Sequence, residues 1–496
     1  MIARNNIMRV YSRSHLQLIM NKFSQVLTVA VAATLSACVV GPNFTPPATP
    51  TIDRYSAGNA IPADAPDTDV PAQQIAMDTE LPLQWWTLFK NDVLGELIKQ
   101  ALAHNQNLAA AQATVEQGQA LAEARLGMRY PQVDLTASSG RQKYGAQFLG
   151  GLAFPPPFTY YSFGAAVSYT LDYNGGTKRA IEQQQALAAY QQYQLHAAQL
   201  TVASSIVEKV IEIAAIQAEI HTIEELLSDD RHNLQMVQVA FDAGSISRVD
   251  VLSAQSQLAS DTTQLPKLRQ QLSEARNSLS VLTGHSPAEV APLDFDLTAF
   301  ELPLQLPVEL PSELVHQRPD ILAAEEQLHA ATAAVGVATA NLYPRITLSA
   351  TFGQQALAAG DLFNRSSSAW SLIGNLTAPV FDGGRLRAER RAALATLSVQ
   401  AAHYQQVVLE SFAQVANALD AVAHGAEQLS AETQALKVAQ QSLDLMRESF
   451  NEGNVGVLQV LDSERLYQQA RLGYVRAQAQ RLYVTAQLFA AVGRSN

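Results

Sequence analysis

The chain has 496 residues, enough to bury a sizeable core and ordinarily enough for two or more domains. Only 16% of the residues are charged, below the roughly 25% of ordinary soluble domains, which indicates large surfaces that do not all face bulk water. A formal net charge of −12, with no block of lysine or arginine, argues against a nucleic-acid partner. The single cysteine excludes an internal disulfide framework and any multi-cysteine metal site.

The first part of the chain has the layout of a signal peptide. Lys22 gives it a basic start, an apolar stretch too short to span a bilayer follows, and small residues lead up to Cys38. The Leu35-Ser-Ala-Cys38 box resembles the bacterial lipoprotein signal, in which the chain is cut before the cysteine and the thiol is lipidated. This resemblance implies a covalent lipid on Cys38, and Val39 after it implies sorting to the outer membrane. The alternative is a secretory signal with a chance cysteine.

The rest of the chain repeats itself. Tyr130-Pro and Tyr343-Pro lie 213 positions apart, Gly-Gly turns follow both, and Phe241-Asp-Ala-Gly matches Phe450-Asn-Glu-Gly at an offset of 209. Prolines mark the seam between the copies, and a proline-rich stretch precedes the first copy. The sequence therefore predicts four parts: a signal peptide over residues 1–37, an irregular tether over 38–82, a first structural repeat over 83–302 and a second over 303–496.

Each repeat is expected to open with an alanine-rich helix, over residues 94–126 and 314–341, which the Tyr-Pro pair ends. Strands with a two-residue period follow and form one hairpin per copy, most clearly over 158–172 and more loosely over 370–381. Strands of about a dozen residues can cross a bilayer, although an ordinary half-buried hairpin is the alternative. Tyrosines near the strand ends would suit the membrane interfaces: Tyr160, Tyr161, Tyr169 and Tyr173.

A membrane crossing would have to be made by strands, because no segment after the signal has 18 consecutive apolar residues. Four strands per protomer cannot close a barrel, and open sheet edges in lipid cost several kcal/mol for each unpaired backbone group. The sequence therefore predicts an oligomer. A dimer would have eight strands and a trimer twelve, and a lumen wide enough for cargo favours the trimer.

Two very long helices are expected after the Gly-Gly turns, over residues 186–242 and 394–451, each running roughly 85 Å at 1.5 Å per residue. Each ends at a glycine-bearing turn and returns as a second helix, and Pro266 should kink the first return helix or follow a break in it. Alanine, glutamine and serine populate these helices, which suits close packing around a water-filled lumen. A periplasmic coiled-coil scaffold is the alternative.

The sequence contains no catalytic motif: there is no HExxH pair, no P-loop and no GxSxG. The histidines are scattered, and acidic doublets at positions 224, 229 and 325 are interpreted as solvated helix faces. The chain is therefore expected not to be an enzyme, and to hold no metal and no cofactor beyond the lipid on Cys38.

Several motifs together resemble the TolC-type outer membrane factors, in the lipoprotein branch that serves resistance-nodulation-division efflux systems. They are Val40-Gly-Pro-Asn-Phe44, Trp85-Trp86 with Phe89, Asn91-Asp92, and the paired Tyr-Pro, Gly-Gly and tip motifs. The resemblance implies an α+β membrane protein: a homotrimer with a transmembrane β-barrel of four strands per protomer and a long α-helical barrel through the periplasm. It also implies an outer-membrane location and two partners, a periplasmic adaptor protein and an inner-membrane pump.

The resemblance also places a gate at the start of the last return helix. Leu458 would be the apolar constriction, Asp462 the acid facing its symmetry mates and Arg465 its ion-pair partner, while Gln459 stands where some relatives carry a second aspartate. Leu458, Asp462 and Arg465 share one helix face by spacing, and a threefold ring of carboxylates would concentrate cations. A plain surface ion pair is the alternative. The adaptor would dock on the tips: Gly244, Ser245, Ser247, Gly453, Asn454 and Gly456.

The function predicted from these features is a passive exit duct for small molecules, driven by the pump. Two alternatives are the outer-membrane exit of a type I protein-secretion system and a tethered coiled-coil lipoprotein that forms no pore.

Overall fold

The structure, a computed structural model, describes residues 39–494 apart from 53, 56–72, 145–155 and 290. The predicted signal peptide and Cys38 lie outside the described residues. The chain divides into two compact units, each built from segments of both predicted repeats. Among the described residues, the sheet unit consists of those in 39–46, 117–188 and 326–402, and the hairpin unit of those in 47–116, 189–325 and 403–494.

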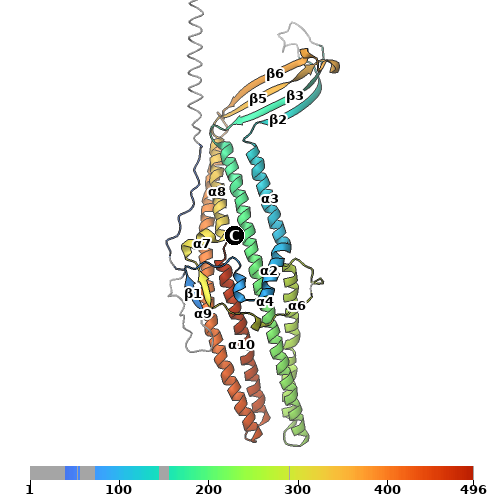
Figure 1. Ribbon diagram of the computed structural model, residues 1–496, viewed down its shortest axis with the longest axis vertical. Helices are drawn as coiled ribbons and strands as arrows, with labels where there is room; N and C mark the ends of the chain where they lie inside the picture. The colour runs from blue at the N-terminus through green and yellow to red at the C-terminus, as the bar shows by residue number, and fades with distance from the viewer. Residues whose placement is uncertain (1–38, 53, 56–72, 145–155, 290, 495–496) are drawn as a thin grey trace, which may run out of the picture. The chain divides into compact units, whose positions relative to one another are not determined.

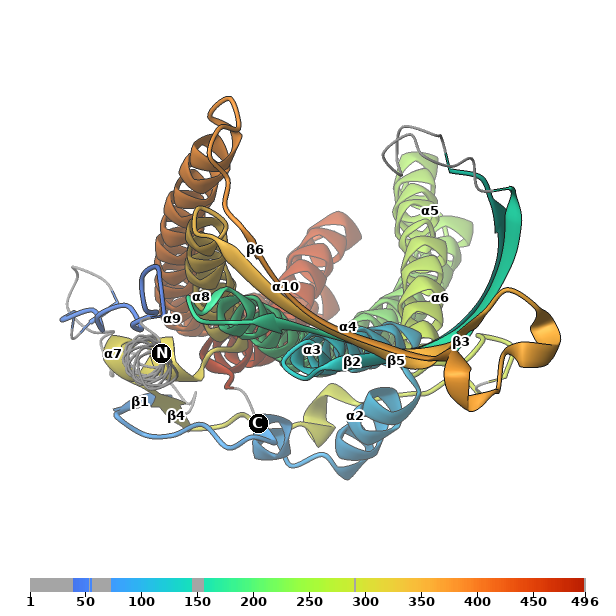
Figure 2. The same ribbon diagram turned by 90° about the horizontal axis from the view of Figure 1, so that it is seen from above.

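The sheet unit contains a four-stranded antiparallel sheet in the order β2-β3-β5-β6 (Figure 1). Its strands are β2 (Gln132–Gln142), β3 (Phe158–Leu171), β5 (Arg345–Ala356) and β6 (Ser368–Thr377). Each predicted hairpin is present, as β2–β3 and β5–β6, and β3 pairs with β5 to join the two. Figure 2 shows that the strands curve along their length.

The last strand differs from its predicted range of 370–381, because it begins at Ser368 and ends at Thr377. Pro379 has no N–H to donate to a ladder, which explains why strand pairing stops before it. Short 3-10 helices η4 (Ala359–Asp361) and η5 (Arg365–Ser367) lie in the connection between β5 and β6.

In the hairpin unit, the segment after the tether packs on the end of the chain. The 3-10 helix η1 (Trp85–Phe89) buries Trp85 and Phe89, and both rings lie about 6 Å from the ring of Phe489. The predicted tether is not irregular throughout. Within it, β1 (Gln74–Met77) pairs in parallel with β4 (Gln305–Val308), at the proline-marked seam between the repeats. A further 3-10 helix, η3, spans Leu297–Ala299.

The two predicted opening helices are each broken, which corrects the sequence expectation. The first is α2 (Asp92–His104) and α3 (Gln106–Gly127), and Asn105 separates them in an extended conformation. The second is α7 (Pro311–Gln317) and α8 (Pro319–Ala340), separated by Arg318, which is extended because proline follows it. Asn105 and Arg318 are 213 positions apart, so the break is a feature of both copies.

The long helices start at the Gly-Gly turns, earlier than predicted. Both α4 (Gly176–Asp242) and α9 (Arg385–Asn451) have 67 residues. The first return helix is divided into α5 (Arg248–Thr262) and α6 (Gln264–Leu282), which confirms the break expected near Pro266. The second return helix, α10 (Val457–Val492), is continuous. Within the described residues, no helix is both long and apolar enough to span a membrane.

Candidate gate at the helical tips

Both helical hairpins turn at a glycine with a positive φ, +73° at Gly244 and +79° at Gly453. Glycine adopts this left-handed conformation at little cost, so it suits the residue after a helix C-terminus. Ser247 then caps the N-terminus of α5, and its backbone N–H and its hydroxyl both donate to Asp250. These two hydrogen bonds lower the pKa of the Asp250 carboxyl. All six residues predicted as the docking tips are exposed in the protomer: Gly244, Ser245, Ser247, Gly453, Asn454 and Gly456.

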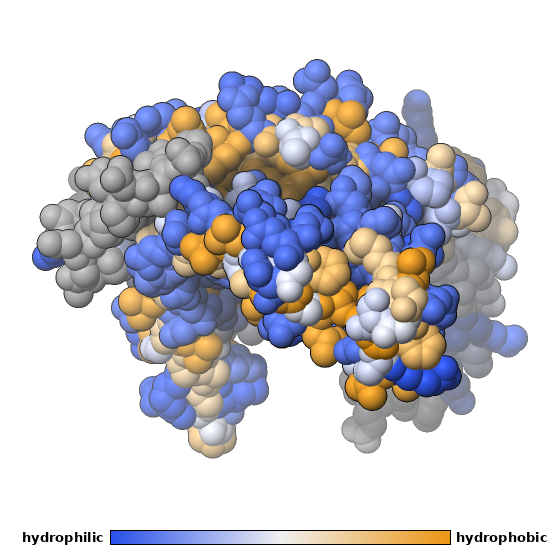
Figure 3. Space-filling model, turned by 90° about the horizontal axis from the view of Figure 1, so that it is seen from below, coloured by the Kyte–Doolittle hydropathy of each residue, from blue (hydrophilic) through white to orange (hydrophobic). Residues whose placement is uncertain are grey.

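The two tips of one protomer pack against each other. A small apolar cluster joins them, with Val237 from α4, Val251 and Ala254 from α5, and Val457 from α10 all buried. Phe241 and Phe450, partly buried, pack against this cluster. Seen from below in Figure 3, hydrophilic residues predominate and apolar residues occur in smaller groups among them. The two tips therefore pack through a small apolar cluster, and the remaining contacts between them are polar.

The predicted gate residues lie on one exposed side of α10. Leu458, Gln459 and Asp462 are exposed, whereas Val457 and Val460 are buried on the other side of the helix. Arg465 donates to Asp462 at 2.6 Å between Nη2 and Oδ1, with side chains 42% and 63% exposed. A single pair this exposed contributes little to stability. The structure brings Asp462 and Arg465 together, and their role as a ring stays a prediction.

Sequence reasoning missed a polar seam between α4 and α10. Glu464, whose side chain is 3% exposed, accepts from Arg447 of α9 at 3.0 Å and from Asn233 of α4 at 3.2 Å. Farther from the tip, Arg476 donates twice to Glu219, at 2.7 and 3.0 Å. Burying a charged carboxylate is costly, and these paired donors offset that cost. Glu464 therefore ties α10 to both long helices two turns above the tip.

A second buried acid lies beside Glu464 and corrects the interpretation of the acidic doublet at position 229. Asp230 of α4 is 5% exposed, so it is not on a solvated face. Burial, together with the neighbouring Asp261 and Glu464, raises its pKa to about 7. Asp261 accepts from Gln257 at 2.6 Å and from Gln264 at 3.1 Å. The three acids form a cluster between the two hairpins, called here the acid seam.

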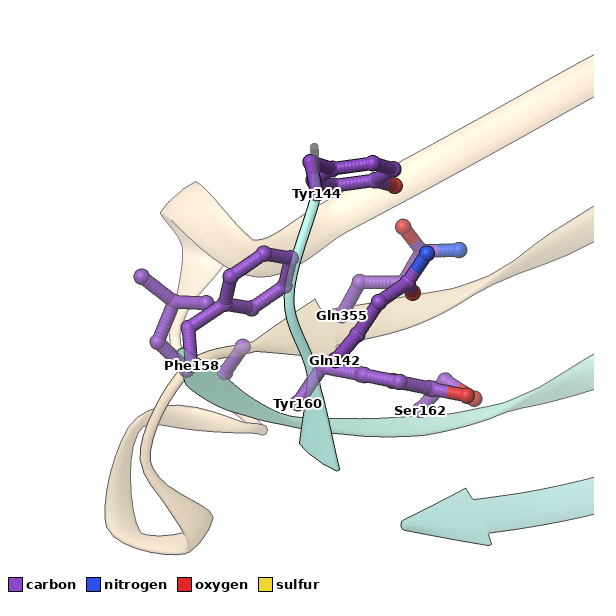
Figure 4. A pocket seen from close by; sticks show the side chains of 8 residues that line it. Gln142, Tyr144, Phe158, Tyr160, Ser162 and Gln355 are labelled. Carbon is purple, nitrogen blue, oxygen red and sulfur yellow. The ribbon is translucent and has the colours of Figure 1, made fainter. Parts of the chain in front are cut away.

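The sheet unit has an aromatic pocket at one end of its strands (Figure 4). It has a volume of about 340 Å³ and opens between the end of β2, the start of β3 and the end of β5. Tyr144 and Phe158 lie 5.8 Å apart by ring centroids, and Tyr160 also lines the pocket. In the part of the chain that the structure describes, no three His, Cys, Asp or Glu residues gather as a metal site.

Comparison with known proteins shows which family this chain resembles. Residues 97–285 and 310–494 match the family described as "Outer membrane efflux protein". The pyoverdine export outer membrane protein OpmQ of Pseudomonas aeruginosa is 32% identical over 417 residues, which cover 83% of this chain and 87% of OpmQ. The probable outer membrane lipoprotein SilC of Salmonella typhimurium is 27% identical over 444 residues, 89% of this chain and 92% of SilC.

Solved structures extend the likeness to the whole architecture. The outer-membrane channel OprN matches with a TM-score of 0.82 and 27% identity, covering 92% of this chain and 99% of the OprN chain. The fold is thus that of the TolC-like outer membrane channels, proteins that conduct rather than catalyse. This chain belongs to the outer membrane efflux protein family. Its function is that of an exit duct in the outer membrane, which confirms the prediction from the sequence.

The acid seam predicts a pH dependence. Because the pKa of Asp230 is raised from 3.8 to about 7, the folded state binds a proton more strongly than the unfolded state. We expect the contribution of Asp230 to the free energy of unfolding to fall as the pH rises from about 4 to 7, by at most about 1.4 kcal/mol per pH unit. Chemical denaturation in detergent across this range measures the free energy of unfolding at each pH. Plotted against pH, this free energy should have a more positive slope for Asp230→Asn than for the wild type.

The control is Asp242→Asn, an exposed acid at the end of α4, which should keep the wild-type slope. Glu309 is also buried with its pKa raised to about 7, but it contributes equally to all three proteins, so only the difference between slopes reports on Asp230. Identical slopes for Asp230→Asn and the wild type would contradict the assignment.

Proposed function

We propose that the protein is the exit duct of a tripartite efflux assembly that exports small molecules. It acts as a homotrimer, anchored by a lipid on Cys38, and takes its cargo through a periplasmic adaptor from a resistance-nodulation-division pump. The observation that carries the proposal is the sheet, which leaves β2 and β6 at open edges and exposes apolar side chains. The printed name of OpmQ, pyoverdine export, favours a small-molecule cargo, and that of SilC supports a lipoprotein.

The open edges of the sheet support an oligomer. Within the described residues, β2 and β6 each pair with one strand only, so each has a row of backbone groups without a partner strand. In a membrane these groups need partners, and closure with further copies supplies them. The exposed apolar side chains on the edge strands are Val133, Leu135, Trp370, Leu372, Ile373 and Leu376. Lipid-facing positions of a barrel would have this character.

The duplication specifies how two copies would pair. Gln132 pairs with Ser168 in the first hairpin and Arg345 with Thr377 in the second, so the first strands are offset by 213 positions and the second strands by 209. Within one chain Val167 of β3 pairs with Ala350 of β5. The counterpart of Val167 in the second repeat, 209 positions later, is Leu376 of β6. The counterpart of Ala350 in the first repeat, 213 positions earlier, is Ala137 of β2. Leu376 is therefore expected opposite Ala137 of the next copy.

The gate proposal follows from the same repetition. Asp462 and Leu458 are exposed in the protomer and Arg465 is partly exposed, so a threefold assembly can bring three copies of them around one axis. Three carboxylates close together repel one another unless each has its own cation, and Arg465 is such a partner at 2.6 Å. With each carboxylate neutralised in this way, three α10 starts can approach one another at the closed tip, with Leu458 as the apolar constriction.

The strand register predicts a specific disulfide. We expect oxidation of the variant Leu376→Cys with Ala137→Cys to give covalent dimers and trimers on a denaturing gel, because directly opposed Cβ atoms lie about 4.5–5.5 Å apart. The matched control is Leu376→Cys with Leu135→Cys, two residues out of register on the same strand. Equal cross-linking of both pairs, or monomers only, would exclude this register.

The gate predicts a change in conduction. Asp462→Ala would leave three Arg465 cations around the axis without their counter-charges, and their mutual repulsion should raise the open population. Recordings from single channels in a planar bilayer measure this directly. Asp242→Ala, an exposed acid at the end of α4, makes the same charge change near the other tip and should leave the recordings unchanged. Unchanged recordings for Asp462→Ala would remove this residue from the gate.

The partners are tested by a photo-crosslinking residue at Ser245, which is exposed at the first tip. In living cells we expect it to capture an adaptor protein together with a proton-driven pump, whereas the same residue at Lys267 on α6 should not. Capture of an adaptor that accompanies an ABC transporter would instead assign the protein to type I secretion. No adaptor at all would refute the tripartite assembly.

A further inference from the structure

The first described residues of the chain are held against the helices of the sheet unit. This segment, Val39–Phe44, is called here the leading segment. The backbone N–H of Val40 donates to the carbonyl of Asn174 at 3.1 Å, in the turn before α4. The guanidinium of Arg179 donates to the carbonyl of Val40 at 3.3 Å and to the side chain of Asn43 at 2.6 Å. The segment is therefore fixed through its backbone as well as its side chains.

The residues that receive the leading segment are themselves fixed. The side chain of Arg179 is 3% exposed and also donates to Glu182 at 2.8 Å, so its charge is paired in a buried setting. His329 of α8 stacks on Phe44 with ring centroids 4.4 Å apart and an angle of 16°. Its two ring nitrogens lie 3.2 Å from Glu182 and from Glu326. The receiving side chains are thus held by contacts of their own, besides those to the segment.

Three glycines make room for this contact. A Cβ on Gly41, which has a φ of +89°, would lie 2.5 Å from the Cα of Gly336. A Cβ on Gly336 would lie 2.7 Å from Cγ of Arg179, and one on Gly175 would lie 2.8 Å from Cγ1 of Val39. Because real Cβ atoms do not approach other atoms this closely, each position requires glycine for the docked arrangement.

The duplication provides an internal comparison. The Gly-Gly turn that contains Gly175 occurs in both copies, whereas the counterparts of Gly336 and His329, 213 positions earlier, are Glu123 and Glu116. The docking features are therefore not a consequence of the repeated fold. Gly336 and His329 occur only in the second repeat, where the leading segment contacts them.

We propose that Gly175, Arg179, His329 and Gly336 form an intramolecular docking site whose ligand is the leading segment, and whose role is to set the level at which the lipid anchor leaves the protein. The inference rests on the proposed lipidation of Cys38 and on the proposed membrane crossing of the sheet. Val39 lies against Gly175, between the last residue of β3, Leu171, and the first of α4. Cys38 is one Cα step of about 3.8 Å from Val39, so the acyl chains start at the level of the strand ends.

A docked anchor behaves differently from a loose one. If residues 38–82 were a free tether throughout, lengthening it anywhere would have a similar, small effect on where the lipid can reach. With the leading segment docked, only residues between the lipid and the docking site change the level of the acyl chains. An insertion should therefore matter when it lies between Cys38 and the leading segment, and should not matter when it lies after the leading segment.

The test inserts the same eight flexible residues on either side of the site. One insertion follows Cys38 and begins with valine, so that the residue after the cysteine is unchanged, and the other lies between Pro50 and Thr51. We expect the first to reduce the yield of trimer in outer-membrane fractions several-fold and the second to leave it at the wild-type level. Equal yields from the two insertions would overturn the docking role.

Mass spectrometry of the N-terminal peptide separates this inference from the proposed function. Lipid present on Cys38 in all three proteins makes the trimer yields a test of docking alone. An unaltered protein without lipid on Cys38 would overturn the proposed anchoring and this inference with it.

A second variant tests the docking contact itself. Gly336→Ala places a methyl group against the side chain of Arg179, which holds Val40 and Asn43, and should release the leading segment. With Cys38 lipidated, Val40→Cys supplies the only free thiol, and its rate of maleimide labelling should rise several-fold in Gly336→Ala. Gly95→Ala, a helical glycine with nothing within 4 Å of its Cβ position, is the control and should leave the rate unchanged. Unchanged labelling in Gly336→Ala would show that the segment is not docked.

Discussion

Each long helical hairpin is tied to the start of its own repeat by one buried side chain that sits in a helix break. The amide of Asn105 donates to the carbonyl of Leu282 at 2.8 Å, and the guanidinium of Arg318 donates to the carbonyl of Ala491 at 2.8 Å. The donors are 213 positions apart and the acceptors 209, so this is one interaction made twice. It satisfies a carbonyl at the end of a return helix that the helix itself cannot pair. This hydrogen bond holds the end of each return helix beside the short helix at the start of the repeat, α2 in the first copy and α7 in the second.

The sequence predicted the parts of this architecture that are written in local patterns. The two-residue period located both strand hairpins, and Pro266 located the break between α5 and α6. The breaks at Asn105 and Arg318 were not predicted, because the alanine-rich pattern continues through both positions and the acceptor carbonyls are some 170 residues away. The pairing of β1 with β4 was missed for the same reason, since strands of four residues carry little periodicity.

Burial of acids was the other feature that local pattern did not reveal. The Asp229-Asp230 doublet has the composition of a solvated face, and only the packing of α4 against α5 and α10 buries Asp230. The spacing of Leu458, Asp462 and Arg465 did place them on one exposed side of α10, because that is a property of the helix itself. What the sequence cannot supply is the neighbouring copy, so their roles in the gate rest on the proposed assembly.

The duplication separates what the fold needs from what the function needs. The Gly-Gly turns and the tie from the helix break to the return helix occur in both copies. The acid seam does not: the counterparts of Asp230, Asp261 and Glu464 are Ala439, Ala470 and Gln255.

Asp462 and Arg465 likewise correspond to Ser253 and Ser256, so the ion pair at the tip belongs to one copy only. In a closed ring of three protomers the contacts within a protomer would then alternate with chemically different contacts between protomers. The buried acids lie at the contacts within a protomer, so their loss of protons weakens those contacts and not the ones between protomers. The two kinds of contact would therefore separate under different conditions. In the proposed trimer, such an alternation would let the tips loosen while the strands and helix breaks, which both copies share, keep their geometry.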